Sequence, residues 1–164
     1  MHNRTTARRE FLGLAGLGAA GFLVAMRSSV APAAGAFQVQ HSAAEWKKLL
    51  GPQRYAVLRE AATERAGSSP LDNEHRKGTF VCAGCGLPLY SSATKFESGT
   101  GWPSFYKPLA NAIVTKTDHV LLMARTEVLC RRCGGHLGHV FKDGPKPTGL
   151  RYCMNGLALK FRPA

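Results

Sequence analysis

Two Cys-x-x-Cys pairs constrain the fold of this 164-residue chain more than any other feature of its sequence. Cys82 and Cys85 form the first pair, Cys130 and Cys133 form the second, and a glycine follows each pair. Two intervening residues let both sulfurs of a pair converge on one ion, and glycine tolerates the positive φ that such a turn needs. Two turns of this kind supply the four thiolates of a tetrahedral site. The sequence therefore predicts one structural Zn²⁺ bound by these four cysteines.

The separation of the two pairs leaves other uses of these cysteines open. The 44 residues between the pairs exceed the usual zinc-ribbon spacing, so the fold of the intervening chain must bring them together. Two disulfide bonds would staple the same loops, and one pair could instead be redox-active, as in a thiol-disulfide oxidoreductase. The repetition of both the pair and its glycine favours zinc.

The rest of the chain predicts a mainly β domain of the α+β class, built from antiparallel sheets with short N-terminal helices. From Gly78 onward, short apolar runs are interrupted by glycine, proline and aspartate, which is typical of antiparallel strands and not of alternating strand-helix units. The expected strands are residues 79–82, 88–90, 113–116, 119–125, 127–129, 139–141, 150–154 and 158–161.

The helices are expected within residues 42–66. Ser42 and Glu45 have the spacing of a capping box, in which each side chain accepts a hydrogen bond from the other residue's backbone. Gly51-Pro52 breaks the chain, and Pro52 suits the first turn of a second helix that ends near Ala62. Tyr55, Leu58 and Ala62 are expected on the buried face of that second helix.

The first 36 residues have the pattern of an export leader. Arg8 and Arg9 precede an apolar stretch, residues 11–25, that is diluted by glycines and shorter than the roughly 20 residues that span a bilayer. Residues 34–36 then fit the A-x-A pattern of signal cleavage. We expect a twin-arginine signal peptide over residues 1–36, one domain over residues 37–164, and export by the twin-arginine translocase to a bacterial periplasm. Cleavage after Ala33, retention of the leader, or a poorly ordered tail remain alternatives.

The basic charge of the chain is spread along the sequence. Without the four arginines and one glutamate of residues 1–36, the net charge of +12 becomes +9. No run of basic residues is longer than two, so we interpret these residues as a solvated surface. A basic zinc module that binds nucleic acid is the main alternative from another class. The leader and the scattered charge argue against it, and we expect no nucleic-acid partner.

The fifth cysteine, Cys153, is left over from the two pairs. If residues 150–154 form a strand, alternation places Arg151 and Asn155 on the same face as Cys153, with Tyr152 and Met154 on the other. A nearby guanidinium favours the thiolate, which is the reactive form of the side chain. A small buried core cysteine is the structural alternative. From these residues alone, a nucleophile and a core cysteine remain equally open.

Three further segments bear on this choice. Residues 94–105 form a glycine-rich loop with Trp102 and Phe105, residues 135–141 hold His136 and His139, and residues 142–149 are rich in turn formers and lead directly to Arg151-Tyr152-Cys153. Together with the two cysteine pairs, in this order, they resemble the type B methionine sulfoxide reductases. The resemblance covers residues 46–161. It implies a mainly antiparallel β fold, a structural Cys₄ zinc site, and reduction of the R epimer of methionine sulfoxide, free or in proteins. In a periplasm we expect the enzyme to meet this substrate mainly in oxidised proteins.

The resemblance also implies the role of each site residue. Cys153 is the nucleophile that attacks the sulfoxide sulfur and is left as a sulfenic acid. His139 is the proton donor to the sulfoxide oxygen, and His136 orients the polar pocket. The resemblance further implies that Trp102 packs against the substrate methyl group and that Phe105 lines the apolar wall of the site. Asn155 would bind water or the sulfoxide oxygen, and Arg151 would favour the thiolate. As structural alternatives, the aromatic residues could belong to the core, and the histidines and Arg151 could be structural supports.

One position departs from the family pattern. Many members carry a resolving cysteine two residues before the tryptophan, and this chain has Thr100 there. With the other four cysteines assigned to zinc, no internal disulfide partner remains for Cys153. We therefore expect an external reductant, either a thioredoxin-like protein or a small thiol.

Overall fold

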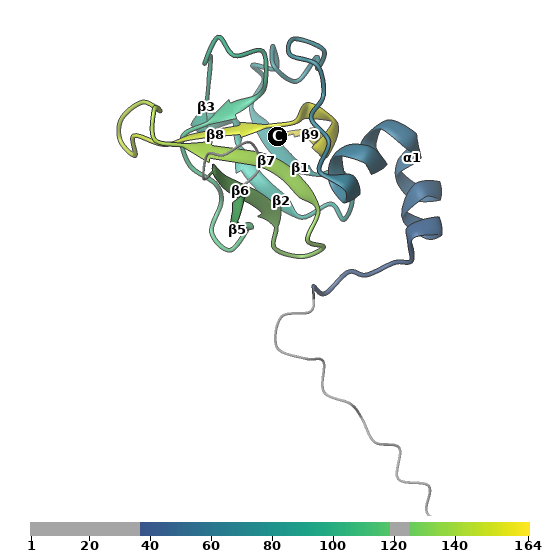
Figure 1. Ribbon diagram of the computed structural model, residues 1–164. Coiled ribbons are helices and arrows are strands. Elements are labelled where there is room, and N and C mark those ends of the chain that lie inside the picture. Colours follow the sequence, from purple (N-terminus) through teal and green to yellow (C-terminus); the bar gives the residue numbers. More distant parts are fainter. Residues whose placement is uncertain (1–36, 119–124) are drawn as a thin grey trace, which may run out of the picture. The chain divides into compact units, whose positions relative to one another are not determined.

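The computed structural model describes residues 37–118 and 125–164, and antiparallel sheets dominate this part of the chain (Figure 1). A three-stranded sheet has the order β2-β1-β9, and a six-stranded sheet has the order β3-β4-β8-β7-β6-β5. Every recorded pairing is antiparallel. The predicted mainly β fold is confirmed. The strand bounds are β1 Gly78–Cys82, β2 Pro88–Ser91, β3 Lys95–Phe96, β4 Ser104–Phe105, β5 Ile113–Asp118, β6 Arg125–Cys130, β7 His136–Phe141, β8 Arg151–Met154 and β9 Leu159–Pro163.

The strands follow the sequence prediction with two kinds of difference. Several are longer than expected, because cross-strand pairing extends beyond the apolar runs. The two-residue strands β3 and β4 were not predicted, since two residues are too few to show an alternating pattern. Most of the strand expected at residues 119–125 lies outside the described residues, and Arg125 begins β6. Short 3₁₀ turns cover Ser92–Thr94 (η1) and Gly156–Ala158 (η3).

The helix α1, Ala43–Glu60, begins with the predicted capping box. The Ser42 N–H donates to the Glu45 carboxylate at 2.8 Å, and the Glu45 N–H donates to the Ser42 hydroxyl at 3.3 Å. Gly51, with φ 69° and ψ 172°, is not helical and breaks the helix before Pro52, as expected (Figure 1). No helix in the described part of the chain is both long and apolar enough to cross a membrane.

The buried face of the second helical segment differs in part from the prediction. Leu58 is buried as expected, but Val57 is its buried neighbour, whereas Tyr55 and Ala62 are only partly buried. Ala62 lies beyond the helix, whose last residue is Glu60 and whose C-cap, Ala61, has a left-handed φ of 55°. Helical spacing therefore no longer describes its orientation.

An aromatic cluster fills the space between the two sheets. Phe105 of the large sheet stacks on Tyr90 of the small sheet at 4.3 Å between ring centroids, and Phe80 meets Phe105 edge-on at 4.9 Å. The Tyr90 hydroxyl donates to the Met154 sulfur at 3.2 Å, so this buried phenol has a partner. All four residues are fully buried. Aromatic side chains of this size contribute much of the stability of a core. Here Met154 belongs to the same buried cluster, so the face of β8 that carries Met154 points into the core.

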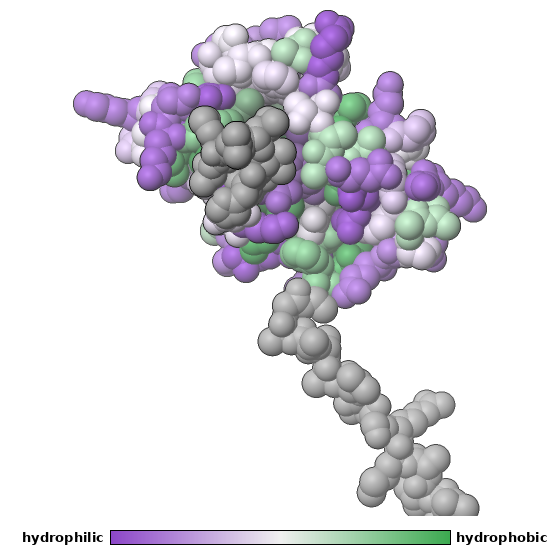
Figure 2. All heavy atoms as spheres, in the orientation of Figure 1, coloured by the Kyte–Doolittle hydropathy of each residue, from purple (hydrophilic) through white to green (hydrophobic). Residues whose placement is uncertain are grey.

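The surface is mixed in polarity. On the face in Figure 2, hydrophobic residues lie in small groups among hydrophilic ones. Among the large hydrophobic residues of the described chain, Leu49 is exposed, at 61% of its surface.

Strands β7 and β8 approach each other closely at Gly138. This residue has φ +153°, and a Cβ built on it would collide with the carbonyl oxygen of Cys153. Gly138 directly precedes His139 and lies two residues after His136. A glycine is needed at this position because the neighbouring strand β8 leaves no room for a side chain.

We expect Gly138→Ala to lower the free energy of unfolding by about 2–4 kcal/mol, from backbone strain and overpacking together. Gly149→Ala is the matched control, because Gly149 has φ +69° but open space around its Cα. That variant should lose only about 1 kcal/mol. Urea denaturation of both variants measures the difference, and equal losses would contradict the steric role of Gly138.

Candidate active site and metal centre

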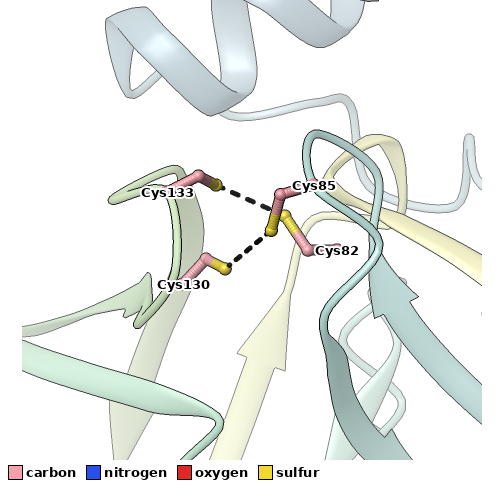
Figure 3. Close-up of side chains that lie close together, drawn as sticks. All are labelled: Cys82, Cys85, Cys130 and Cys133. Atoms are coloured by element: carbon pink, nitrogen blue, oxygen red, sulfur yellow. Dashed lines mark hydrogen bonds between the residues drawn. The ribbon is translucent and has the colours of Figure 1, made fainter. Parts of the chain in front are cut away.

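The four paired cysteines meet at the ends of two strands. Cys82 is the last residue of β1 and Cys130 the last of β6, and Figure 3 shows all four sulfurs pointing toward one another. Their sulfurs lie within 4.8 Å of one another. The Cys82–Cys133 and Cys85–Cys130 distances are 3.7 and 3.5 Å. Disulfide sulfurs lie ~2.05 Å apart, whereas Zn–S bonds of ~2.3 Å in a tetrahedron place them about 3.8 Å apart. The donor set and its spacing therefore fit a metal site.

The two turns that present these sulfurs have the same backbone geometry. Gly86 and Gly134 have φ of 72° and 67°, which confirms why glycine follows each pair. Their N–H groups donate to the carbonyl oxygens of Cys82 and Cys130, both at 2.8 Å. Hydrogen bonding among the crowded sulfurs raises the pKa of Cys82 and lowers that of Cys85, with Cys130 as the main partner of each. A bound cation would stabilise the thiolate forms of these four sulfurs.

A small pocket lies over strands β7 and β8. Its volume is about 150 Å³. Four of the predicted site residues line it, namely Trp102, His139, Cys153 and Asn155. The other lining residues were not predicted, and they are Thr63, Arg125, Gly138 and Phe141. The predicted alternation along β8 is observed, since Cys153 reaches the pocket while Met154 lies in the core.

Cys153 lies at the centre of this arrangement because of strand pairing. Its Cα pairs with His139 on β7 and with Ser104 on β4. The strand register therefore places His139 beside Cys153, and both residues line the pocket. On the other side, the Thr100 hydroxyl lies 3.8 Å from the Cys153 sulfur. Thr100 in turn shares a 2.8 Å hydrogen bond with Ser98, and Ser98 another of 2.8 Å with the buried Ser104.

His136 lies behind His139 and does not line the pocket. It is only 4% exposed, and its Nδ1 lies 2.7 Å from a carboxylate oxygen of Glu127 on β6. The rings of His136 and His139 meet edge-on with centroids 5.5 Å apart. This contact suits a residue that orients the neighbouring imidazole, which is the role expected for His136.

Arg151 is held by two contacts that the sequence did not predict. Its guanidinium donates two hydrogen bonds to the Asp143 carboxylate, at 3.0 and 2.7 Å, and lies 4.5 Å from the centroid of the Phe141 ring. The hydrogen bonds from Arg151 lower the pKa of Asp143. The sequence showed Asp143 only as part of a turn-rich segment, so its pairing with Arg151 needed the folded loop.

The Cys153 thiol is subject to opposing influences. Burial raises its pKa, while hydrogen bonds from Thr100, Arg151 and Ser104 and the charge of Arg151 lower it. Burial prevails, and the pKa lies above the ordinary thiol value. The expectation that Arg151 favours the thiolate is met in direction, but its effect is smaller than the cost of desolvation.

Asn155 and Glu64 form a buried polar connection behind the pocket. The Asn155 amide accepts from the Glu64 N–H at 3.0 Å and donates to the Leu137 carbonyl at 3.2 Å. The Glu64 carboxylate accepts from the N–H groups of Gly156 and Leu157 at 2.5 and 2.9 Å. The Trp102 indole donates to the Glu64 carbonyl at 3.2 Å. Glu64 thus anchors the pocket wall, and no local sequence pattern indicated it.

Phe105 differs from its expected position. It was expected on the apolar wall of the substrate site, but it is fully buried against Tyr90 and Phe80 and does not line the pocket. Phe141, on β7 beside His139, lines the pocket in its place. Alternation explains the difference, since on β4 it is Ser104, next to Phe105, whose hydroxyl faces the active-site side.

The mainly β fold thus combines a pocket lined by a thiol, an imidazole and an indole with a separate four-sulfur centre. The model of the SelR domain matches residues 50–163. The peptide methionine sulfoxide reductase MsrB of Leptospira interrogans is 54% identical over 127 residues, 77% of this chain and 97% of that protein. That of Bradyrhizobium diazoefficiens is 55% identical, covering 77% and 91%. The chloroplastic peptide methionine sulfoxide reductase B1 of Arabidopsis thaliana is 51% identical, covering 71% and 58%. The chain therefore belongs to the type B methionine sulfoxide reductase family.

Because burial raises the pKa of Cys153, its reactive thiolate fraction should still be rising above the pH at which an ordinary thiol is half ionised. Iodoacetamide alkylation, followed at the Cys153 peptide by mass spectrometry across pH, measures this. Arg151→Met should raise the pKa further and slow alkylation at pH 7.5 by about 2- to 10-fold, tenfold corresponding to one pKa unit. Lys142→Met, which removes an exposed charge nearby, should change little. A midpoint below that of an ordinary thiol would contradict this account.

Proposed function

We propose that this chain reduces the R epimer of methionine sulfoxide, free or in oxidised proteins, to methionine. The observation that carries the proposal is the position of Cys153 in a small pocket beside Trp102 and His139. The indole can pack against the substrate methyl group, and the imidazole can donate a proton to the sulfoxide oxygen. The names of the matched relatives, which describe peptide methionine sulfoxide reductases, support the same reaction.

The first half-reaction transfers oxygen from substrate to enzyme. A hydrogen bond or proton from His139 makes the sulfoxide sulfur electrophilic, and the Cys153 thiolate attacks it. The attack forms a bond between the Cys153 sulfur and the substrate sulfur. The oxygen then shifts to Cys153 as this sulfur–sulfur bond and the substrate sulfur–oxygen bond both break, so methionine leaves as a thioether and Cys153 becomes a sulfenic acid. The substrate gains two electrons and Cys153 loses two. Arg151 and Thr100 stabilise the thiolate as it forms.

The second half-reaction needs an external thiol. Thr100 lies next to the Cys153 sulfur where a resolving cysteine would be needed, and the other four cysteines form the separate cluster. A donor thiol therefore attacks the sulfenic acid, releasing water and forming a mixed disulfide. A second thiol then releases Cys153 and leaves the donor as a disulfide. A thioredoxin-like protein or a small thiol can act as this donor.

The proposal extends to the metal and the cellular location. The four clustered cysteines would hold one structural Zn²⁺, which supports the fold and takes no part in the redox steps. The leader pattern of residues 1–36 supports export by the twin-arginine translocase to the periplasm, where the enzyme would repair oxidised proteins.

A stereospecific assay tests the reaction. With dithiothreitol as reductant, the wild-type protein should reduce the R epimer of methionine sulfoxide at least 100-fold faster than the S epimer. Cys153→Ser should abolish turnover, because removal of a nucleophile that acts in covalent catalysis costs several orders of magnitude. The Cys153→Ser protein should keep its thermal midpoint, which serves as the folding control. Preference for the S epimer, or an active Cys153→Ser variant, would refute the assignment.

A metal assay tests the structural centre. We expect one zinc per chain by elemental analysis and four sulfurs that resist alkylation in the native protein. Cys85→Ser should lose the metal and lower the thermal midpoint by ~10 °C or more, at roughly 2–8 °C per kcal/mol. Cys153→Ser should retain full zinc content. A stable, metal-free protein with two disulfides would contradict the prediction.

A further inference from the structure

A second, larger hollow adjoins the active-site pocket. It has a volume of about 1030 Å³ and lies between the second half of α1, the segment 62–76, and the chain from Gly156 to Pro163. Thr63, which is exposed, lines both this groove and the pocket that holds Cys153. Thr63 is therefore a wall residue common to both hollows, which border each other there.

The sizes of the two hollows indicate different occupants. Sites that enclose a whole small ligand measure roughly 300–1,000 Å³. The pocket at Cys153, at about 150 Å³, takes only the end of one side chain. The backbone and the neighbours of a methionine sulfoxide in a protein must then lie outside it, and the groove has room for several such residues.

The groove is cationic over a partly apolar floor. Arg54, Arg65 and Lys160 line it, and in the described part of the chain none of them has an acidic partner. The two carboxylates that line the groove already have partners, and one of these partners, Arg76, also lines the groove. Glu64 accepts backbone hydrogen bonds from Gly156 and Leu157, and Glu74 pairs with Arg76 at 2.6 Å.

The apolar part of the lining includes the partly buried side chains of Leu71, Leu157 and Phe161. A surface of this composition suits a peptide that carries carboxylates beside apolar residues, because the carboxylates meet unpaired cations and the apolar groups meet the floor.

We propose that this groove binds the polypeptide that flanks an oxidised methionine and selects acidic residues there. The inference rests on the proposed function, since it names the substrate class of the same site. The occupant is the substrate protein itself in an extended conformation. The border at Thr63 connects the groove to Cys153, and the charge of the groove sets the preference for acidic flanks.

Peptide kinetics on the full chain test this. Two heptapeptides with a central R-methionine sulfoxide are compared, one with aspartate and glutamate flanks and one with lysine flanks, together with free R-methionine sulfoxide. We expect kcat/KM to be at least 5-fold higher for the acidic peptide, with the difference in KM. This preference should fall toward unity in 0.5 M NaCl, because exposed charges are screened.

Charge reversal in the groove provides the matched comparison. Arg65→Glu with Lys160→Glu should remove or invert the preference, while activity on free R-methionine sulfoxide and the thermal midpoint stay unchanged. Lys48→Glu with Lys107→Glu is the control, because both lysines are exposed and neither lines the groove or the pocket. This control makes the same charge change and should keep the wild-type preference.

The outcomes separate the two proposals. Loss of the R-epimer reaction on every substrate would refute the proposed function. Reduction of free R-methionine sulfoxide with equal kcat/KM for both peptides, or equal loss of preference in groove and control variants, would overturn the groove assignment alone. Tighter, groove-dependent binding of a single-stranded oligonucleotide or of phosphatidylglycerol vesicles than of the acidic peptide would overturn it too, by assigning another occupant.

Discussion

The two sheets meet at the four clustered cysteine sulfurs, and a strand that ends at this junction lies next to one that carries pocket residues. One pair follows β1 of the small sheet, and the other lies between β6 and β7 of the large sheet. The second turn leads directly into β7, which carries His136 and His139. The first turn, at Cys82 and Cys85, follows the end of β1. Strand β1 pairs with β9, which comes after β8 and Cys153 in the chain. A cation at the cluster would therefore stabilise the relative position of the strands that hold the thiol and the imidazole.

The pocket itself is stabilised by buried polar contacts and by the core on its far side. Tyr90 and Phe105 pack against the inward face that includes Met154, so Cys153 must face outward. Glu64 is hydrogen-bonded to the segment that follows β8, through the Asn155 side chain and the N–H groups of Gly156 and Leu157 in η3. Satisfied buried networks of this kind hold loops in one position, since an unpaired buried carboxylate or amide is costly. The tryptophan wall depends on the same network through the Glu64 carbonyl.

The environment of Cys153 balances protection against reactivity. Burial raises the pKa of the thiol, while hydrogen bonds from Arg151, Thr100 and Ser104 lower it and so favour the thiolate. Arg151 can act in this way because Asp143 and Phe141 hold its guanidinium in place. The pocket around the thiol is small, at about 150 Å³, and takes only the end of one side chain.

Features set by local backbone geometry were determined by the sequence alone. The paired cysteines with their glycines, the capping box at Ser42, the break at Gly51 and the two faces of residues 151–155 could all be predicted, because each depends on spacing within a few residues. Most of the strands were predicted for the same reason. The family resemblance predicted in addition that Trp102 and His139 belong to the site and that Cys153 is the nucleophile. Tertiary structure alone placed Phe105 in the core, paired Arg151 with Asp143, and raised the pKa of the thiol. It also brought Glu64 to Asn155, 91 residues away in the chain. Such contacts depend on which distant segments pack together, and no local periodicity encodes that packing.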